Sequence, residues 1–401
     1  SGFTALELPD SVASLGSYTF KDCMNLGSVS YPAGLTTVDS LGGVFAGCTM
    51  LTSITVPEGV TALPNYVFKN CTNFTSITLP DSLTFISSYA FYGCSNLSSV
   101  NIPAELGSIG GSAFYGCAGL SGVDLPETLT DIGNYAFCGC SGFTALELPD
   151  SVASLGSYAF KDCTNLESVN YPTGLTAVDS SGGVFAGCTM LTSITVPEGV
   201  AALPGYAFKN CTNFTSVTLP DSLLSISNCA FYGCTNLISV NMPAQLASIG
   251  NSAFYGCEGL TGVDLPETLT SIGGSAFYGC IGFTALELPD SITSLGAYAF
   301  KNCTNLESVN YPAGLTTVDS LGGVFSSCTK LTSITVPEGV TALPNYAFKN
   351  CTNFTSVILP STLTSIGSYA FYGCSNLEKI WIDEAVISVG TSAFYNCSSL
   401  T

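Results

Sequence analysis

The sequence predicts a mainly β solenoid of about 17 short coils, each 23 to 25 residues long. The first observation is the motif Phe-x-x-Cys, which recurs seventeen times between Phe20 and Cys397, mostly in steps of 23 residues with three steps of 25. The second is a larger duplication: Ser1–Asp10 is identical to Ser141–Asp150, and the whole pattern starts again from there. Because so short a repeat cannot bury its apolar face alone, successive copies must stack on one another to form a core.

Each repeat is expected to begin with a short β-strand. In the third repeat, Ile54 and Val56 are apolar, and we expect both to face the core. Ser53 and Thr55 alternate with them and should face the solvent. Pro57 ends the strand, because proline has no N–H to offer a neighbouring strand. Stacked copies would pair in one continuous parallel sheet with strands about 4.8 Å apart, and the rest of each repeat should hold turns and a short extended or 3₁₀ segment.

The domain organisation follows from the same periodicity. We expect a single solenoid domain over residues 1–401, built from the tandem blocks 1–140, 141–280 and 281–401. Both ends fall inside a repeat, and neither carries the polar cap that solenoids usually require. The chain is therefore expected to be a segment of a longer array, which leaves end-to-end association of copies open.

The Phe and Cys of every repeat are predicted core residues. Burying each phenylalanine ring is worth about 2 kcal/mol, and a free cysteine behaves as a small buried hydrophobe. Equivalent cysteines of successive coils point the same way and do not present the geometry of a disulfide, so we expect reduced, buried thiols. Two of the nineteen cysteines, Cys138 and Cys229, fall outside this column and lie four repeats apart, too far to pair with each other.

Composition excludes several classes of function. The chain has eight lysines, no arginine, no histidine and twenty-eight acidic residues, for a net charge of −20. Such a charge repels the phosphates of nucleic acids and anionic membrane surfaces, and no apolar run approaches the roughly 18 residues of a membrane span. Without histidine there is no Ser–His or Cys–His nucleophile, and one cysteine per coil builds a column, not a zinc site. We therefore expect no catalytic residues and no enzyme.

The outward strand positions are the first candidate for a ligand-binding surface. They are mostly small and uncharged, so they could contact an extended glycan or a flat protein face, although Ser and Thr also simply suit exposed strands. One exception is an exposed tryptophan, which could anchor a ligand or belong to a divergent terminal repeat. The candidate residues are Ser53, Thr55, Thr78, Asn101, Thr195, Thr218, Asn241 and Trp381.

Carboxylates form the second candidate site. At two places an Asp of one repeat should stack on a Glu of the next, and the residue after each strand-ending proline adds two more acids. Like charges about 4.8 Å apart repel, so a Ca²⁺ ion or a cationic ligand would relieve them; the alternative is that they are solvated and keep the protein soluble. No other cofactor is expected. The clusters are Asp124, Glu127, Glu147 and Asp150, and Asp264, Glu267, Glu287 and Asp290.

The repeat resembles the BspA-type leucine-rich repeat. Its pattern is Leu-x-x-Ile/Val-x-Ile/Leu-Pro followed by Leu-Thr-x-Ile-Gly-x-x-Ala-Phe-x-x-Cys, and the segment Tyr89–Leu97 is a close match. The resemblance covers essentially all 401 residues and implies a right-handed solenoid on the surface of a cell, secreted and non-catalytic. The longer repeats depart from the pattern by an insertion such as Asp39–Gly43, and the repeat at Ile380–Asp383 lacks the strand-ending proline.

Two functions fit this resemblance. The first is an adhesion module that binds a protein or glycan on a host or neighbouring cell, with repeated weak contacts adding up through avidity. The alternative is a structural spacer or self-associating filament subunit, which the near-perfect duplication suits slightly better because a specific pocket rarely needs three copies.

Overall fold

A computed structural model of the chain describes residues 4–32, 34–35, 37–38, 42–175, 177–178, 182–315, 317–318 and 322–401. The described residues form short parallel strands joined by turns, with no helix among them, which confirms the predicted mainly β solenoid. The chain divides into two compact parts, an N-terminal unit, Ser1–Pro197, and a C-terminal unit, Glu198–Thr401. The prediction of one uninterrupted solenoid over 1–401 stays a prediction, and residues 39–41 of the predicted insertion lie outside the described residues.

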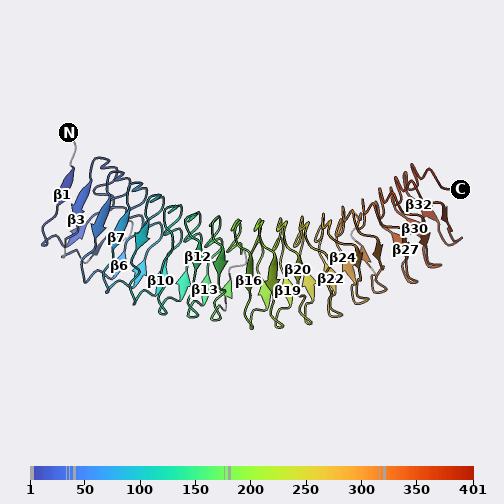
Figure 1. The fold of residues 1–401 in the computed structure, drawn as a ribbon, viewed down its shortest axis with the longest axis horizontal. Coiled ribbons are helices and arrows are strands. Elements are labelled where there is room, and N and C mark those ends of the chain that lie inside the picture. Colours follow the sequence, from blue (N-terminus) through green and yellow to red (C-terminus); the bar gives the residue numbers. More distant parts are fainter. Residues whose placement is uncertain are drawn as a thin grey trace. The chain divides into compact units, whose positions relative to one another are not determined.

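The N-terminal unit carries two ladders, each a row of parallel strands from successive coils. Most coils contribute one strand to each ladder. The first ladder is the predicted one, and the second runs along another side of the coil (Figure 1). The first ladder comprises β1 (Ala5–Glu7), β3 (Ser28–Ser30), β5 (Ser53–Thr55), β7 (Ser76–Thr78), β9 (Ser99–Val100), β12 (Ala145–Leu146), β14 (Ser168–Val169) and β16 (Ser193–Thr195). The second comprises β2 (Ser14–Leu15), β4 (Thr37–Val38), β6 (Ala62–Leu63), β8 (Phe85–Ile86), β10 (Ser108–Ile109), β11 (Asp131–Ile132), β13 (Ser154–Leu155) and β15 (Ala177–Val178).

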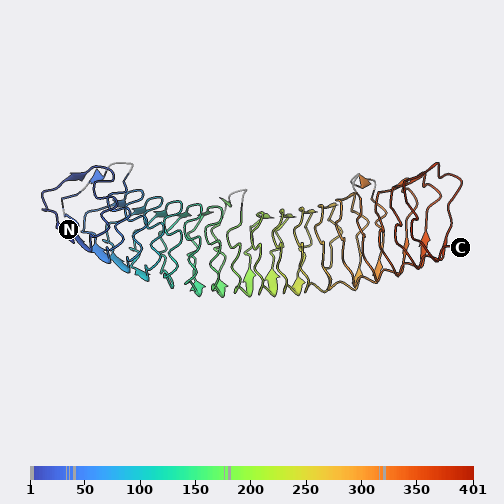
Figure 2. The same ribbon diagram turned by 90° about the horizontal axis from the view of Figure 1, so that it is seen from above.

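The C-terminal unit repeats this plan, and the strands of its successive coils lie side by side (Figure 2). Its first ladder comprises β18 (Ser216–Thr218), β20 (Ser239–Val240), β23 (Ala285–Leu286), β25 (Ser308–Val309), β27 (Ser333–Thr335), β29 (Ser356–Ile358) and β31 (Lys379–Ile380). Its second ladder comprises β17 (Ala202–Leu203), β19 (Ser225–Ile226), β21 (Ser248–Ile249), β22 (Ser271–Ile272), β24 (Ser294–Leu295), β26 (Thr317–Val318), β28 (Ala342–Leu343), β30 (Ser365–Ile366) and β32 (Ser388–Val389).

Register within a ladder follows the repeat length. Ile54 of β5 lies opposite Ile77 of β7, and the flanking hydroxyl residues Ser53 and Thr55 lie opposite Ser76 and Thr78. The two isoleucines are buried, whereas Ser53, Thr55 and Thr78 are exposed. The predicted alternation of inward and outward residues is therefore confirmed.

The expected single continuous sheet is divided into shorter ones. In the N-terminal unit the first ladder forms separate sheets, among them β5-β7-β9 and β12-β14. The coil between these two sheets has no described strand over residues 121–126, and Gly122 occupies its strand position, where glycine weakens pairing because it has no side chain to pack. The first ladder also breaks between β3 and β5, at one of the longer repeats.

Stacked phenylalanines fill the core. In the N-terminal unit the ring of Phe114 lies 5.0 Å from that of Phe91 and 5.1 Å from that of Phe137, centroid to centroid. All three rings are fully buried, so each stabilises its coil by about 2 kcal/mol through burial, with a further gain from stacking. The predicted phenylalanine core is confirmed.

The cysteine column is also confirmed, and it has a role that the sequence did not indicate. All nineteen cysteines are free thiols, and most are buried. Each described column thiol with a recorded hydrogen bond donates it to the carbonyl oxygen of the phenylalanine in the preceding coil, for example from Cys71 Sγ to Phe45 O at 3.2 Å. Burial raises the pKa of Cys303 to about 12, so these thiols stay protonated and act as donors that link adjacent coils.

Candidate ligand-binding surfaces

The outward face of the first ladder places most of the predicted hydroxyl residues in solvent. In the N-terminal unit Ser53, Thr55, Thr78 and Thr195 are exposed, and Thr55 lies directly opposite Thr78 in the paired strands. In the C-terminal unit Thr218 is exposed at the end of β18. The predicted serine and threonine residues therefore present their hydroxyl groups to the solvent.

The two predicted asparagines are engaged by the backbone of the preceding coil. The side-chain oxygen of Asn101 accepts a hydrogen bond from Leu79 N at 2.9 Å, and its amide nitrogen donates to Leu79 O at 3.0 Å. Asn241 makes the same pair of bonds to Leu219, both at 2.9 Å. Each carboxamide thus imitates one further rung of the ladder, which leaves it with less capacity for a ligand than the sequence suggested.

The side chain of Trp381 is almost fully exposed, with 83% of its surface open to solvent. It occupies the position of Asn241 one block earlier, so the clamp on the preceding coil is lost there. Ile358 replaces Thr218 in the same way and is 63% exposed. The outward face of β29 and its neighbour is therefore apolar where the other blocks are polar.

The second acidic cluster lines one groove of about 950 Å³ in the C-terminal unit. Its floor is formed by β20, β23 and the intervening coil, which has no described strand in the first ladder because Gly262 takes that strand position. The missing strand hollows the face between the two sheets. Four exposed carboxylates border the hollow: Asp264, Glu267, Glu287 and Asp290.

These carboxylates converge on one groove without forming a coordination shell. Among the described residues, no three acidic, cysteine or histidine side chains come close enough together to hold a metal ion. One acid of each cluster is instead held by the next coil: Asp290 Oδ1 accepts from Ala313 N at 2.8 Å, and Asp150 Oδ1 from Thr173 N at 2.9 Å. The latter bond lowers the pKa of Asp150. Calcium binding stays a prediction.

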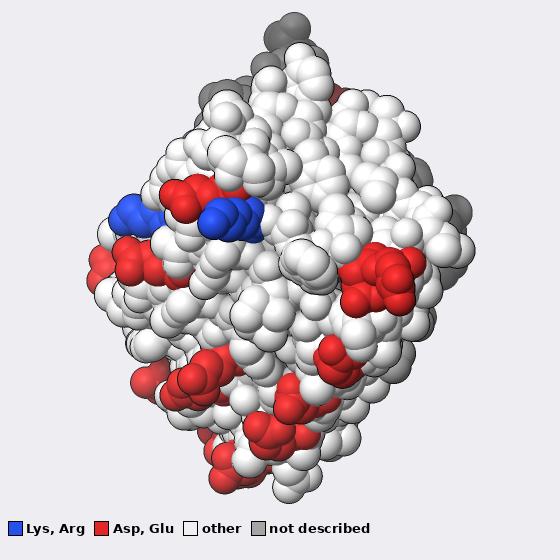
Figure 3. Space-filling model, turned by 90° about the vertical axis from the view of Figure 1, so that its right-hand side faces the viewer, with Lys and Arg blue, Asp and Glu red and all other residues white. Residues whose placement is uncertain are grey.

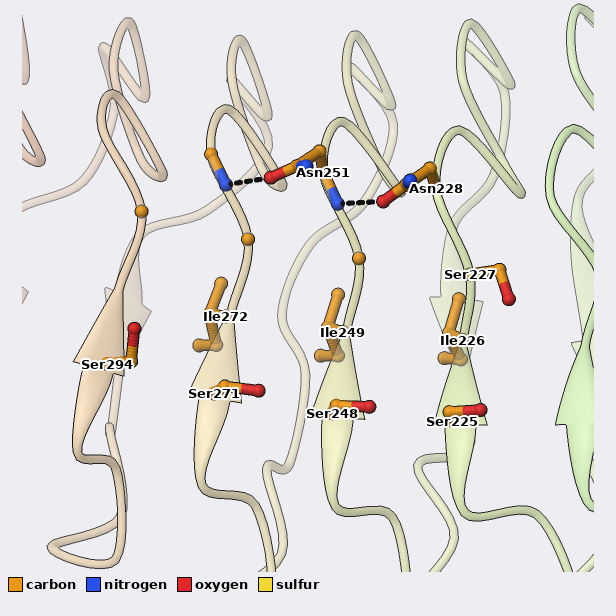
Figure 4. Close-up of a pocket in the computed structure, with 14 residues that line it drawn as sticks. Ser225, Ile226, Ser227, Asn228, Ser248, Ile249, Asn251, Ser271, Ile272 and Ser294 are labelled. Carbon is orange, nitrogen blue, oxygen red and sulfur yellow. Dashed lines mark hydrogen bonds between the residues drawn. The ribbon is translucent and has the colours of Figure 1, made fainter. Parts of the chain in front are cut away.

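A second groove, which the sequence reasoning missed, follows the second ladder of the C-terminal unit. It measures about 570 Å³ and is lined by β19, β21, β22 and β24. Figure 4 shows Ser225, Ser248 and Ser271 in a row, one hydroxyl per coil. The structure records no hydrogen bond from a described residue to these three hydroxyl groups. The recurrent motif Ser-Ile-Gly could have indicated this second row of strands, but the sequence alone predicts it only as part of a connecting segment.

Asparagines and glycines form the upper rim of this second-ladder groove. Asn228 Oδ1 accepts a hydrogen bond from Asn251 N at 2.7 Å, and Asn251 Oδ1 accepts one from Gly274 N at 2.7 Å (Figure 4). The neighbouring Gly273 is required by close packing, because a Cβ there would lie 2.5 Å from Asn251 N. The rim is thus fixed by backbone contacts between coils, while the serines below it stay open.

The N-terminal unit has the matching groove with a different lining. It measures about 530 Å³ and runs along β8, β10, β11 and β13. Phe85 and Asp131 take the places that Ser225 and Ser271 hold in the next block of the sequence. The same scaffold therefore presents an uncharged hydroxyl row in one unit and a mixed aromatic and acidic row in the other.

The surface charge is unevenly distributed. In the view of Figure 3 the acidic side chains form several separate patches, whereas basic side chains appear in one small area and most of the surface is uncharged. The structure gives one ion pair among its described residues, from Lys161 Nζ to Asp162 Oδ2 at 3.1 Å. Nor do those residues include any helix long and apolar enough to cross a bilayer.

Comparison with known proteins identifies the repeat. The chain matches the family model described as "BspA type Leucine rich repeat region (6 copies)" over residues 1–121, 107–238, 181–303, 225–354 and 322–401. A search of curated proteins finds no match.

Solved structures give a second comparison. A leucine-rich repeat protein from Bacteroides ovatus is 28% identical, with a TM-score of 0.75, and the match covers 84% of this chain and 92% of that one. A leucine-rich repeat protein from Eubacterium ventriosum is 22% identical, with a TM-score of 0.49 and coverage of 88% and 84%. A leucine-rich cell surface protein from Faecalibacterium prausnitzii is 21% identical, with a TM-score of 0.38 and coverage of 98% and 88%. The first of these likenesses supports the solenoid fold.

Proposed function

The chain belongs to the BspA-type leucine-rich repeat family, and from this premise we propose that it is a non-catalytic adhesion module whose second-ladder groove in the C-terminal unit holds an extended polysaccharide. The proposed location is extracellular, at a cell surface, with a partner on a host or neighbouring cell. Protein ligands, which the family resemblance also allows, are the less favoured partner.

One observation carries this proposal: the row of unpaired hydroxyl groups in the second-ladder groove of the C-terminal unit. Ser225, Ser248 and Ser271 are half-buried, which shields a bound ligand in part from water, yet they lack hydrogen-bond partners among the described residues. Successive strands of a ladder lie about 4.8 Å apart. The groove therefore offers an identical polar contact at every coil.

The spacing favours a polysaccharide over a peptide. An extended peptide that followed the groove would present side chains to it at intervals of twice the rise per residue, ~6.6 Å, and would drift out of register with the coils. A pyranose unit is roughly as long as one coil spacing, so successive sugars would meet equivalent serines. Weak contacts repeated along one chain then add up through avidity.

The lining of the groove also supports a role without chemistry. Its residues are serines, isoleucines, asparagines and glycines, so no titratable group among them could act as a general acid or base. The chain has no histidine, and column thiols such as Cys303 have a pKa raised by burial, which removes them as nucleophiles at neutral pH.

The test is binding of the full chain to immobilised neutral polysaccharides: dextran, mannan and a β-glucan. The double variant Ser225→Phe, Ser271→Asp gives the C-terminal groove the residues that the N-terminal groove carries, so the fold should tolerate it. We expect this variant to weaken binding roughly tenfold or more, because it blocks the groove and removes two hydroxyl contacts. The matched control is Thr218→Phe on the first ladder, which should leave binding unchanged.

Other results would contradict the proposal. If only Thr218→Phe weakened binding, the first-ladder face would be the ligand surface and the groove would not. If none of the three polysaccharides bound the chain, the polysaccharide would be the wrong ligand class.

The structural alternative, a spacer or self-associating filament subunit, is favoured by one observation. Ile358 and Trp381 place adjacent exposed apolar side chains on the outward face, which suits contact between copies better than contact with a sugar row. Analytical ultracentrifugation over a concentration series would show larger species for a self-associating protein, and Trp381→Asn should then reduce them.

A further inference from the structure

We propose that the C-terminal unit carries a separate binding surface for an acidic polysaccharide, on a stripe of lysines and tyrosines at the turn that follows the second ladder. We call this surface the Lys–Tyr stripe. It shares no residue with the second-ladder groove, so the inference does not rest on the function proposed above. Its members are Tyr206, Lys209, Tyr232, Tyr255, Tyr278, Tyr298, Lys301, Tyr346, Lys349, Tyr369 and Tyr372.

Charge segregation is the first argument. Six of the eight lysines of the chain occupy one position of the repeat, directly after the core phenylalanine, and the other two are Lys330 and Lys379. The six are Lys21, Lys69, Lys161, Lys209, Lys301 and Lys349. In a chain of net charge −20, this position is where positive charge is concentrated. Because salt screens charges beyond about 8 Å under physiological conditions, the local sign decides what binds there.

The geometry of the stripe is the second argument. The rings of Tyr232, Tyr255 and Tyr278 stack with centroid separations of 4.7 Å and 4.5 Å. Lys209 Nζ lies 5.2 Å from the centroid of Tyr232, and Lys301 Nζ lies 5.7 Å from that of Tyr278. A stack of three tyrosines is therefore closed at both ends by an ammonium group held through cation–π attraction.

The stacked rings determine how a ligand would be recognised. Their faces are covered by one another, so a sugar cannot stack on them, and the half-buried rings present their edges and phenol groups. Tyr278 Oη accepts a hydrogen bond from Asn302 Nδ2 at 2.8 Å. Recognition would use phenol hydroxyls and ammonium groups, which suits carboxylate or sulfate groups attached to a sugar chain.

The lysines of the C-terminal stripe are not neutralised by carboxylates. Within the described residues no ion pair is recorded for Lys209, Lys301 or Lys349, whereas Lys161 of the N-terminal unit pairs with Asp162 at 3.1 Å. Asn302 stands where the N-terminal unit has this aspartate. The N-terminal stack is also shorter, because Cys138 replaces the third tyrosine. Among the described residues, Lys301 therefore lacks the carboxylate partner that Lys161 has, and it lies at the end of the longer tyrosine stack.

Spacing again selects a polysaccharide. Lys209 and Lys301 are four coils apart, about 19 Å, and Lys301 and Lys349 are two coils apart, about 10 Å. Both intervals are whole multiples of the coil spacing, so a chain of pyranose units can meet successive ammonium groups in the same way. An extended acidic polypeptide rises about 3.3 Å per residue and does not keep this register.

The experiment measures binding of the full chain to immobilised hyaluronate and chondroitin sulfate, with dextran as the uncharged reference and poly-glutamate as the acidic polypeptide. The stripe variant is Lys209→Gln with Lys301→Gln. The control is Lys330→Gln with Lys379→Gln, which changes the net charge by the same amount with two exposed lysines outside the stripe. Thermal melting of each variant shows whether it is folded.

We expect both acidic polysaccharides to bind in a manner that weakens with added salt. The stripe variant should lose roughly tenfold or more in affinity, because each lost charged contact is worth about that factor, and the control should match the parent chain. Dextran binding in the second-ladder groove should not change in either variant, which separates this inference from the proposed function.

Several outcomes would overturn the inference. Equal loss in the stripe variant and the control would mean that overall charge alone drives binding. Poly-glutamate binding as tightly as the polysaccharides would mean that the ligand class is wrong. No binding of either acidic polysaccharide by the folded parent chain would mean that the lysines and tyrosines only stabilise the turns.

Discussion

The thiol of Cys94 donates a hydrogen bond to the main-chain carbonyl of Phe68 in the preceding coil, with Sγ and O 3.0 Å apart. The same contact recurs from Cys117 to Phe91 at 3.2 Å. One column of side chains therefore fills the core and also ties each coil to the one before it. In a repeat protein this matters because stability is the sum of the coils and the interfaces between them.

Replacing Cys94 by alanine tests this link. Cys94→Ala removes a buried sulfur and its hydrogen bond, and we expect the free energy of unfolding to fall by about 1 to 2 kcal/mol. Urea unfolding followed by circular dichroism would measure it. Cys229→Ala is the control, because Cys229 is half-buried and outside the column, and it should change stability by less than about 0.5 kcal/mol. Equal effects of the two substitutions would contradict a special role for the column.

Alkaline pH should destabilise the fold through the same thiols. Burial raises the pKa of Cys303 from 9.0 to about 12. A pKa that is higher in the folded state than in the unfolded one stabilises the fold below pH 9, and this contribution is lost as the pH rises from 9 to 12. Each such thiol contributes up to about 1.4 kcal/mol per pH unit in that window. Melting temperatures that stay constant from pH 7 to pH 10.5 would contradict the buried, protonated column.

Periodicity explains how much of this structure the sequence could predict. It determines which residues stack on which, so the core position of Phe114 and the outward position of Thr55 were both expected. It does not reveal which side chain finds a main-chain partner. The Cys94 bond to Phe68 depends on the offset between coils, which spacing along the chain does not contain.

The grooves were missed for a similar reason. Ser248 belongs to a segment too short for a strand pattern to be recognised, and its pairing with Ser225 and Ser271 exists only because three coils stack in register. The division of the sheet at Gly122 was also missed. A glycine weakens a strand without always ending it, so its presence in the sequence does not show that the strand is lost. The lysines of the Lys–Tyr stripe share one position of the repeat, so periodicity could have aligned them, whereas the stacking of the tyrosine rings is seen only in the structure.

The asparagine clamp should contribute to stability more than to binding. Asn241→Asp keeps the size of the side chain but replaces the amide that donates to Leu219 O with a carboxylate oxygen. We expect a loss of about 1 to 2 kcal/mol at pH 7, because one hydrogen bond is exchanged for a repulsion between two oxygens. Thr218→Ala, on the adjacent strand and without this clamp, should be nearly neutral. Urea unfolding measures both, and a neutral Asn241→Asp would contradict the clamp.

The acidic groove should attract cations without selecting calcium. Asp264, Glu267, Glu287 and Asp290 border one hollow, but no three of them approach as metal ligands in the described part of the chain. We expect Ca²⁺ and Mg²⁺ to bind weakly and about equally, and added salt to suppress both. Isothermal titration would measure this. Tight binding of Ca²⁺ alone, abolished by Asp264→Asn with Glu287→Gln, would instead establish the calcium site that the sequence left open.

Asp162→Asn should improve anion binding around Lys161, at the position of the N-terminal unit that corresponds to Lys301 in the Lys–Tyr stripe. The substitution breaks the ion pair with Lys161, whose atoms lie 3.1 Å apart with the two side chains 39% and 50% exposed. Asn302 occupies the same position in the C-terminal unit with a φ of 62°, close to the 58° of Asp162, so the turn should accept asparagine. An exposed pair contributes little to folding, and stability should change by less than about 1 kcal/mol.

With Lys161 released, affinity for hyaluronate should rise several-fold at low salt, and the further substitution Lys161→Gln should abolish the gain. Unchanged affinity in the folded Asp162→Asn protein would show that this lysine is not limited by its carboxylate partner.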